Sequence, residues 1–321
     1  MNVNYNALID IAQDRGAGRT LEQLKASKGP LKGQESQRLR TYCTSECMEP
    51  GRDLDLYGRI LFSGELAAVK NDFELRTATY ELAGSSKAEA QQKASDELYK
   101  LTWGPTRVTI YNLMLLATMI YPERREGYLE IVRWLIDEAK VPVNGTDLSG
   151  STAIHHAISC KPAFDPEFAQ ILYDAGGDVN LRNRYGGNAA HESTMILDFQ
   201  NPEVIQKHAR AIDWFLTHGG SIDIKDNDTI TARMNLSMFK NFTGPQKRLF
   251  TPLFNAIERA DRRRKQMRNT GCKLCLREES DANKLMICSR CKTAKYCAPP
   301  RACQKIDWPR HKEKCKAPAQ Q

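Results

Sequence analysis

The sequence has few of the features that mark membrane proteins, secreted proteins or common enzymes. Its longest apolar run, Leu113 to Ile120, includes Thr118 and is much shorter than the roughly 20 residues that span a bilayer, so we expect no membrane partner. The start of the chain, Met1 to Asn4, has no basic flank followed by an apolar core. We therefore expect no signal peptide and an intracellular location in the cytoplasm, the nucleus or both. Phosphate-binding glycine loops, nucleophile elbows and kinase signatures are also missing, so we expect no enzyme.

Acidic residues are scarce toward the C-terminus. Residues 259–321 hold 18 Lys and Arg against 6 Asp and Glu, whereas residues 1–258 hold 29 against 33. A basic terminus can attract nucleic acid or an import receptor. The simpler interpretation, which we favour, is that these side chains solvate a small domain and offset the negative charge of metal-bound thiolates. The apolar content of 41% is ordinary and allows one large or two modest domains.

Cysteines are concentrated in one short stretch, residues 272–315, which holds seven of the ten cysteines and one of the six histidines. These eight residues form four pairs: Cys272/Cys275, Cys288/Cys291, Cys297/Cys303 and His311/Cys315. Zinc takes four thiolate or imidazole ligands in a tetrahedron, so eight ligands predict two Zn²⁺ ions. A segment this short buries too little apolar surface to fold alone, and metal binding must supply the free energy. Without a secretory signal, disulfides are the weaker explanation, and the spacing alone permits either sequential or interleaved sites.

This stretch resembles the MYND zinc finger, whose pattern includes the pairs Tyr296-Cys297, Cys303-Gln304, Asp307-Trp308 and His311-Lys312, followed by Cys315. The resemblance implies interleaved sites, one formed by Cys272, Cys275, Cys297 and Cys303, the other by Cys288, Cys291, His311 and Cys315. The chain departs from the family between the fifth and sixth ligands, where it has five residues, Ala298 to Ala302, instead of three. We expect Pro300 in this insertion to open the helix that carries Cys303, because proline is tolerated in a first helical turn.

The resemblance also implies a role in protein–protein interaction. MYND fingers hold short proline-containing peptide segments, and the groove positions of the family correspond to Ser289, Gln304 and Trp308. A tryptophan face suits a proline ring, and a neighbouring glutamine can hydrogen-bond an exposed backbone. We therefore expect these three residues to form a peptide-binding site, with Trp308 also packing within the finger.

An internal repeat precedes the finger. The pairs Val143-Asn144 and Val179-Asn180 are 36 residues apart, and Ile222-Asp223 follows 43 residues later. The segments "DAGGDVN", "THGGSID" and "GSTAIHHA" resemble the ends and beginnings of helices in ankyrin repeats, whose period is about 33 residues. The resemblance implies a mainly helical solenoid over residues 54–258, with degenerate terminal units. In such units the histidines near the start of the first helix are structural, and we expect the same of His155, His156 and His191.

The remaining residues complete the expected organisation. Residues 1–53 are expected to be a helical lead-in, with one short helix around Leu8 to Ile11 and another around Leu21 to Leu24. We expect Cys43 and Cys47 in this region to be ordinary small residues. Ser86 and Glu89 are spaced as a capping box for an exposed helix ending near Leu101. Residues 259–271 are expected to be a basic linker that continues the last helix, residues 272–315 the finger, and residues 316–321 a tail.

Together these features predict a zinc-binding adaptor in which ankyrin repeats act as a scaffold and the finger binds proline-containing peptides. The alternative is a nuclear transcriptional regulator, or a protein that associates with nucleic acid through the basic C-terminal region. That alternative is weaker because the finger lacks the ligand order of a two-cysteine, two-histidine, base-reading finger. A lysine methyltransferase is weaker still, because it needs a separate catalytic domain and helical repeats occupy the remaining sequence.

Overall fold

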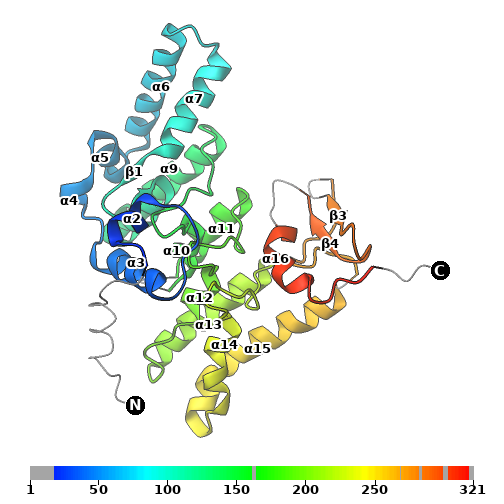
Figure 1. Ribbon diagram of the computed structural model, residues 1–321. Coiled ribbons are helices and arrows are strands. Elements are labelled where there is room, and N and C mark those ends of the chain that lie inside the picture. Colours follow the sequence, from blue (N-terminus) through cyan, green and yellow to red (C-terminus); the bar gives the residue numbers. More distant parts are fainter. Residues whose placement is uncertain (1–17, 161–163, 268, 282–283, 299–302, 318–321) are drawn as a thin grey trace. The chain divides into compact units, whose positions relative to one another are not determined.

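The computed structural model describes residues 18–160, 164–267, 269–281, 284–298 and 303–317 (Figure 1). The described chain is mainly helical, with two small antiparallel two-stranded sheets. It forms two compact units, one made of residues 1–153 with 183–186, the other of residues 154–182 with 187–321. Each unit is treated below by itself. The expected helix around Leu8 to Ile11 lies outside the described residues.

The first unit is built from short helices that pair with their neighbours in sequence. Its α-helices are α2 (Leu21–Ala26), α3 (Gly33–Ser45), α4 (Pro50–Asp53), α5 (Leu56–Ser63), α6 (Leu66–Leu82), α7 (Lys87–Lys100), α8 (Ile110–Ile120) and α9 (Arg125–Asp137). A 3-10 turn, η1 (Pro122–Arg124), precedes α9, and the strands β1 (Thr102–Trp103) and β2 (Val108–Thr109) pair between α7 and α8. Gly64 ends α5 in the left-handed region at φ 77°, and the expected capping box of Ser86 and Glu89 starts α7.

The lead-in helices α2 and α3 are part of the core of this unit. Leu24, Leu31 and Leu39 are buried together with Leu148 and Tyr185, which come from the repeat region. Arg184 reinforces the contact, because its guanidinium donates hydrogen bonds to the backbone carbonyls of Leu24 (2.9 Å) and Leu148 (3.0 Å). The lead-in therefore covers the beginning of the repeat array. Cys43 lies on α3 and Cys47 just beyond it, where it is exposed.

Three turns repeat with the spacing of the sequence pattern, and each begins at Asp147, Asn183 or Asp226. The side-chain oxygen of the first residue accepts hydrogen bonds from backbone N–H groups two or four residues later, as Asp147 does from Ser149 and Ser151 at 2.9 Å. Each turn also closes through a hydrogen bond from the fourth residue back to the first carbonyl. This turn recurs once per repeat and leads into a short helix each time, which is the arrangement of ankyrin repeats.

Helix pairs follow these turns. The first helices are α10 (Ala153–Ile158), α12 (Ala189–Ser193) and α14 (Ala232–Ser237). The second helices are α11 (Pro166–Asp174), α13 (Pro202–Thr217) and α15 (Gly244–Gln266), and the 3-10 turn η2 (Met238–Asn241) follows α14. Phe168, Phe215 and Phe250 on the second helices are fully buried and fill the core of the second unit. Stacked helix pairs of this kind bury a continuous apolar layer that no single pair can bury alone.

The histidines of the first helices have structural roles. His155 Nε2 lies 2.9 Å from the carbonyl oxygen of Leu181, and His191 Nε2 lies 3.2 Å from that of Ile230, so each ring links its helix to the following turn. Both rings are buried. Each ring makes a hydrogen bond that holds two segments of the fold together. This agrees with the structural role expected for His155 and His191.

The boundary expected between residues 258 and 259 falls inside α15. Apolar side chains on one face of this helix are buried, namely Phe250, Leu253, Ala256 and Ile257. Beyond them the helix continues, and its arginines contact helix α13 of the same unit: Arg259 pairs with Asp213 at 2.7 Å, and Arg263 donates to the Thr217 carbonyl. The basic segment is therefore largely helix with specific contacts, and the second unit includes the finger.

Candidate metal centre

A small hairpin and one helix position the cysteines of the finger. Strands β3 (Leu285–Ile287) and β4 (Lys295–Cys297) are antiparallel, and α16 (Cys303–His311) follows them (Figure 1). Two backbone hydrogen bonds shape the cysteine turns, one from Cys288 N–H to the Ala294 carbonyl and one from Cys272 N–H to the Arg277 carbonyl, both 2.8 Å. Short turns of this kind aim two thiols at one point.

The first group consists of four buried cysteines, Cys272, Cys275, Cys297 and Cys303. The sulfur of Cys275 lies 3.4 Å from that of Cys297 and 3.8 Å from that of Cys303. Zinc–sulfur bonds of about 2.3 Å in a tetrahedron place the sulfurs about 3.8 Å apart. The separation of the sulfurs therefore fits one Zn²⁺ ion held by four thiolates.

The second group consists of Cys288, Cys291, His311 and Cys315. His311 Nε2 lies 3.4 Å from the sulfur of Cys288 and 3.6 Å from that of Cys291, and the sulfurs of Cys288 and Cys315 are 3.8 Å apart. Tetrahedral zinc with ordinary zinc–nitrogen and zinc–sulfur bonds gives nitrogen–sulfur separations of about 3.6 Å. This group therefore fits a second Zn²⁺ ion. The structure interleaves the four pairs along the chain in the grouping that the family resemblance implies.

The electrostatics of the two groups favour a divalent cation. A backbone N–H of Ala294 points at the sulfur of Cys291 and lowers the pKa of that thiol to about 7. Cys303 donates hydrogen bonds to the sulfurs of the neighbouring cysteines, which stabilises its protonated form and raises its pKa. Burial lowers the pKa of His311, which favours the neutral ring that binds metal. When bound, zinc compensates the thiolate charge and supplies folding free energy.

A buried hydrogen-bond network connects the hairpin to α16. Tyr296 on β4 donates a hydrogen bond of 2.7 Å to the carboxylate of Asp307, and Arg310 donates to the other oxygen at 2.8 Å. Asp307 is 2% exposed and Tyr296 is 1% exposed. The network fixes the helix that supplies Cys303 and His311. The sequence motif contained Tyr296 and Asp307, but only the structure gives them this positioning role.

The finger packs against the repeats of the second unit. Arg264, on the last turns of α15, donates hydrogen bonds to the carbonyl of Leu274 in the first cysteine turn (2.8 Å) and to that of Gly220 in the repeats (2.5 Å). Ile224 is buried within the same cluster as the finger cysteines. At Gly219 an added Cβ would lie 2.0 Å from the Cys275 carbonyl oxygen, so only glycine permits this approach.

A second contact involves aromatic side chains. The guanidinium of Arg277 lies 4.8 Å from the centre of the Tyr173 ring, a favourable cation–π distance. Tyr173 meets His218 edge to face at 4.7 Å, and His218 stacks on Trp214 at 3.9 Å. Sequence reasoning missed this contact, because Arg277 has no feature that separates it from the other basic residues of the segment.

The expected peptide-binding residues lie on the hairpin end and on α16. Ser289 is exposed in the turn after β3. Gln304 and Trp308 are four residues apart on α16 and therefore share one face of that helix. Trp308 is 39% exposed, and its ring centre is 5.9 Å from that of His311. Pro299 and Pro300 lie outside the described residues, and α16 begins at Cys303.

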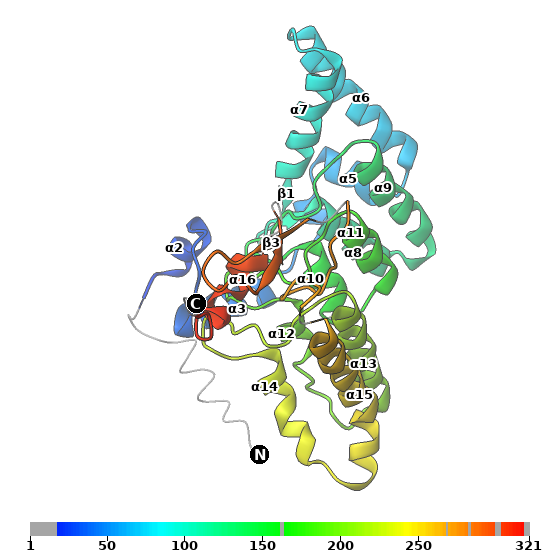
Figure 2. The ribbon, with the colours of Figure 1, turned by 90° about the vertical axis from the view of Figure 1, so that its right-hand side faces the viewer.

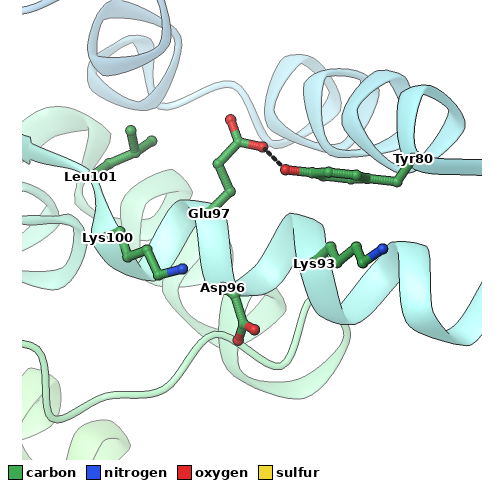
Figure 3. A pocket seen from close by; sticks show the side chains of 6 residues that line it. All are labelled: Tyr80, Lys93, Asp96, Glu97, Lys100 and Leu101. Carbon is green, nitrogen blue, oxygen red and sulfur yellow. Dashed lines mark hydrogen bonds between the residues drawn. The ribbon is translucent and has the colours of Figure 1, made fainter. Parts of the chain in front are cut away.

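A surface pocket of about 320 Å³ lies elsewhere, between α6 and α7 (Figure 3). It is lined by Tyr80, Lys93, Asp96, Glu97, Lys100 and Leu101. The carboxylate of Glu97 already has two partners within the chain: Tyr80 donates a hydrogen bond to it at 3.1 Å, and Arg76 forms an ion pair with it. Its two lysines and two acidic residues balance in charge, so the pocket offers no single sign of charge to a ligand.

The fold and the two ligand groups define a helical repeat protein with a two-zinc finger. Residues 272–315 match the family model of the MYND finger. Among solved structures, the chain is similar to an ankyrin repeat domain from Acinetobacter baumannii AYE, with 16% identity and a TM-score of 0.37 over 69% of this chain and 92% of that one. It is also similar to the ankyrin repeat domain of Bcl-3, a member of the IkappaB protein family, with 16% identity and a TM-score of 0.33 over 63% and 84%.

No curated protein matches the chain. The assignment of the helical units therefore rests on the repeated turns, helices and histidine contacts described above. Among the described residues, no helix combines the length and the apolar character needed to cross a membrane.

Proposed function

We propose that the protein is a non-catalytic adaptor whose finger binds a short proline-containing peptide segment of a partner protein, with the ankyrin units as its scaffold. The observation that carries this proposal is the exposure of Trp308. The other aromatic side chain of the finger, Tyr296, is buried, whereas Trp308 is 39% exposed on the helix face that also carries Gln304. An exposed indole beside a hydrogen-bonding side chain suits a proline ring and its neighbouring backbone.

Strand β3 of the hairpin offers a second element for peptide contact. Met286 and Ile287 on β3 are 51% and 55% exposed, and Ser289 follows in the turn. An extended peptide can combine backbone contacts to a strand with one side chain in an aromatic site. Trp308 would supply the apolar face, and Gln304 a hydrogen bond to the peptide backbone.

Calorimetry with the full-length, zinc-loaded chain tests the proposal against a library of synthetic proline-rich peptides. We expect Trp308→Ala to weaken binding about thirtyfold, because loss of an aromatic anchor costs at least about 2 kcal/mol. Lys284→Ala, at an exposed position on the hairpin, is the matched control and should bind as the wild type does. Zinc content must remain unchanged in both variants. Absence of peptide binding, or equal binding by Trp308→Ala, would refute the proposal.

The nucleic-acid alternative has less support. Three arginines of the basic segment make contacts within the chain: Arg259 with Asp213, Arg263 with the Thr217 carbonyl, and Arg264 with two backbone carbonyls. We further propose that the protein acts inside the cell, in the cytoplasm or nucleus, where reducing conditions keep seven ligand thiols available for zinc.

A further inference from the structure

Helix α6 has apolar residues on two opposite faces. On its inner face Val69, Phe73 and Thr77 recur every four residues and are buried. On its outer face Leu75 is 62% exposed and Leu82 is 91% exposed. Scattered exposed leucines are ordinary on protein surfaces, but two leucines seven residues apart lie on the same line along a helix. The inner face is buried against the rest of the unit, and the outer face is exposed, where a partner could bind.

The outer face follows a heptad-like spacing. Exposed residues separated by alternating steps of three and four form a seam along the helix, consisting of Ala68, Asn71, Leu75, Ala78 and Leu82. Such spacing brings one line of side chains toward a second helix in coiled-coil packing, and small residues between leucines let the partner approach closely. The seam therefore has the geometry of a helix-docking surface.

The seam is held in a preformed position. Helix α6 pairs with α7, and in Figures 1 and 2 this hairpin extends away from the other helices of its unit. Inside the hairpin Arg76 pairs with Asp72 at 2.5 Å and also with Glu97, while its guanidinium lies over the ring of Tyr57. Figure 3 shows Tyr80 and Glu97 joined across the two helices. These contacts all lie on the inner side, so a partner on the outer side meets an ordered helix.

The charges along the seam indicate which partner fits. Glu74 and Glu81 are exposed and lie seven residues apart along one edge of the seam. At the other edge Asp72 is paired with Arg76 and is only partly exposed. A second copy packed antiparallel would place the glutamates of the two chains together, and a parallel copy in register would set Glu74 against Thr79, which has no charge to pair with it. Like charges at such flanking positions disfavour pairing, whereas the Lys or Arg side chains of a basic helix would be attracted to the glutamates.

We propose that the outer face of α6 docks an amphipathic helix of a partner protein that carries apolar residues at heptad spacing and Lys or Arg facing Glu74 and Glu81. This surface lies on the first unit and is independent of the peptide site proposed for the finger. The adaptor then has two separate recognition surfaces, one for an extended peptide and one for a helix.

A pair of synthetic helical peptides of about 21 residues tests the proposal with the full-length, zinc-loaded protein. Both carry leucine at the heptad positions, and the flanking positions are lysine in one peptide and glutamate in the other. By fluorescence anisotropy we expect the lysine peptide to bind at least tenfold more tightly than the glutamate peptide, with the preference weakening as salt is raised. The variant Leu75→Ser/Leu82→Ser should lose at least tenfold in affinity for the lysine peptide. Leu56→Ser, which changes a leucine 78% exposed on α5, is the control and should bind within twofold of the wild type.

Charge reversal separates docking on the seam from nonspecific attraction. Glu74→Lys/Glu81→Lys should exchange the preference, so that the glutamate peptide becomes the tighter ligand. The proposal is overturned if the lysine peptide does not bind, if the leucine variant binds it equally well, or if charge reversal leaves the preference unchanged. It is also overturned if sedimentation shows a dimer of the wild type that the leucine variant abolishes, since the seam would then bind a second copy of this chain.

Discussion

The finger and the repeats of the second unit bury their interiors in different ways. The core of the finger consists largely of cysteines, joined by a few apolar residues such as Leu274 and Tyr296. The core of the repeats contains Phe168, Phe215 and Phe250, with aliphatic residues around them. Thiols brought this close together repel once ionised, whereas buried rings attract without any cofactor. The comparison indicates that metal stabilises one part and apolar burial the other, although the two parts share a contact surface.

The largest expected effect is that of removing zinc from the full-length chain. Metal analysis should find two zinc ions per chain, and a chelator should unfold the finger, because structural zinc contributes on the order of 10–16 kcal/mol in small fingers. Far-UV circular dichroism should retain most of its helical signal, since the repeats are held by apolar burial. Cys297→Ser should lower the zinc content, while Cys43→Ser, outside the finger, should leave it at two. One zinc or fewer in the wild type, or loss of the helical signal on chelation, would contradict the comparison.

The next effect concerns the residue that joins the two parts. Arg264→Ala removes the donors to the carbonyls of Leu274 and Gly220, so we expect a loss of about 2–4 kcal/mol in the stability of the zinc-loaded chain. Arg262→Ala changes an exposed arginine two residues earlier on the same helix and should cost less than about 0.5 kcal/mol. Urea unfolding of both variants measures the difference. Equal effects would show that the contact of Arg264 does not stabilise the docked finger.

A matched pair of glycines isolates the contact between finger and repeats. Gly176 and Gly219 occupy equivalent positions in successive units, at φ 94° and 80°, but an added Cβ meets nothing within 4 Å at Gly176 and the Cys275 carbonyl at Gly219. Alanine at either position costs about 1–2 kcal/mol for the left-handed backbone, and Gly219→Ala should cost a further 1–3 kcal/mol or so for the clash. The excess should disappear in chelator, where the finger is unfolded. If Gly219→Ala remained more destabilising than Gly176→Ala in chelator, the extra loss of stability would arise within the repeats and not from contact with the finger.

The smallest effect is the pH dependence of the repeats. Burial lowers the pKa of His191, so its folded pKa lies below the value of about 6.5 in the unfolded chain. The unfolded state then binds the proton more readily, and stability is fully present above pH 6.5 and falls as the pH drops through the folded pKa. Urea unfolding in chelator between pH 8 and 5 should show this fall, and His191→Gln should reduce it. An unchanged pH profile in the variant would assign the dependence to other groups.

The sequence predicted most of the architecture wherever the signal was local. The turns at Asp147, Asn183 and Asp226 lie where the repeat spacing places them, and the capping box at Ser86 forms as its residues indicate. The contribution of the lead-in helices was not predictable, because the partners of Leu24 and Leu39 lie more than a hundred residues away in the chain. The outer seam of α6 was also missed, because apolar residues on both faces weaken the periodicity of the helix.

For the metal centre, the sequence by itself indicated the eight candidate ligands and their four pairs. Zinc accepts few side-chain types, and pairing within short turns is a local property that residue spacing records. Only the tertiary structure decided how the finger is held. Arg264 is one of several consecutive basic residues, and Gly219 resembles any glycine that ends a helix, so neither indicates its partner. Their roles arise from the approach of segments that are distant in sequence, where backbone carbonyls provide the hydrogen-bond acceptors and a missing Cβ provides the space.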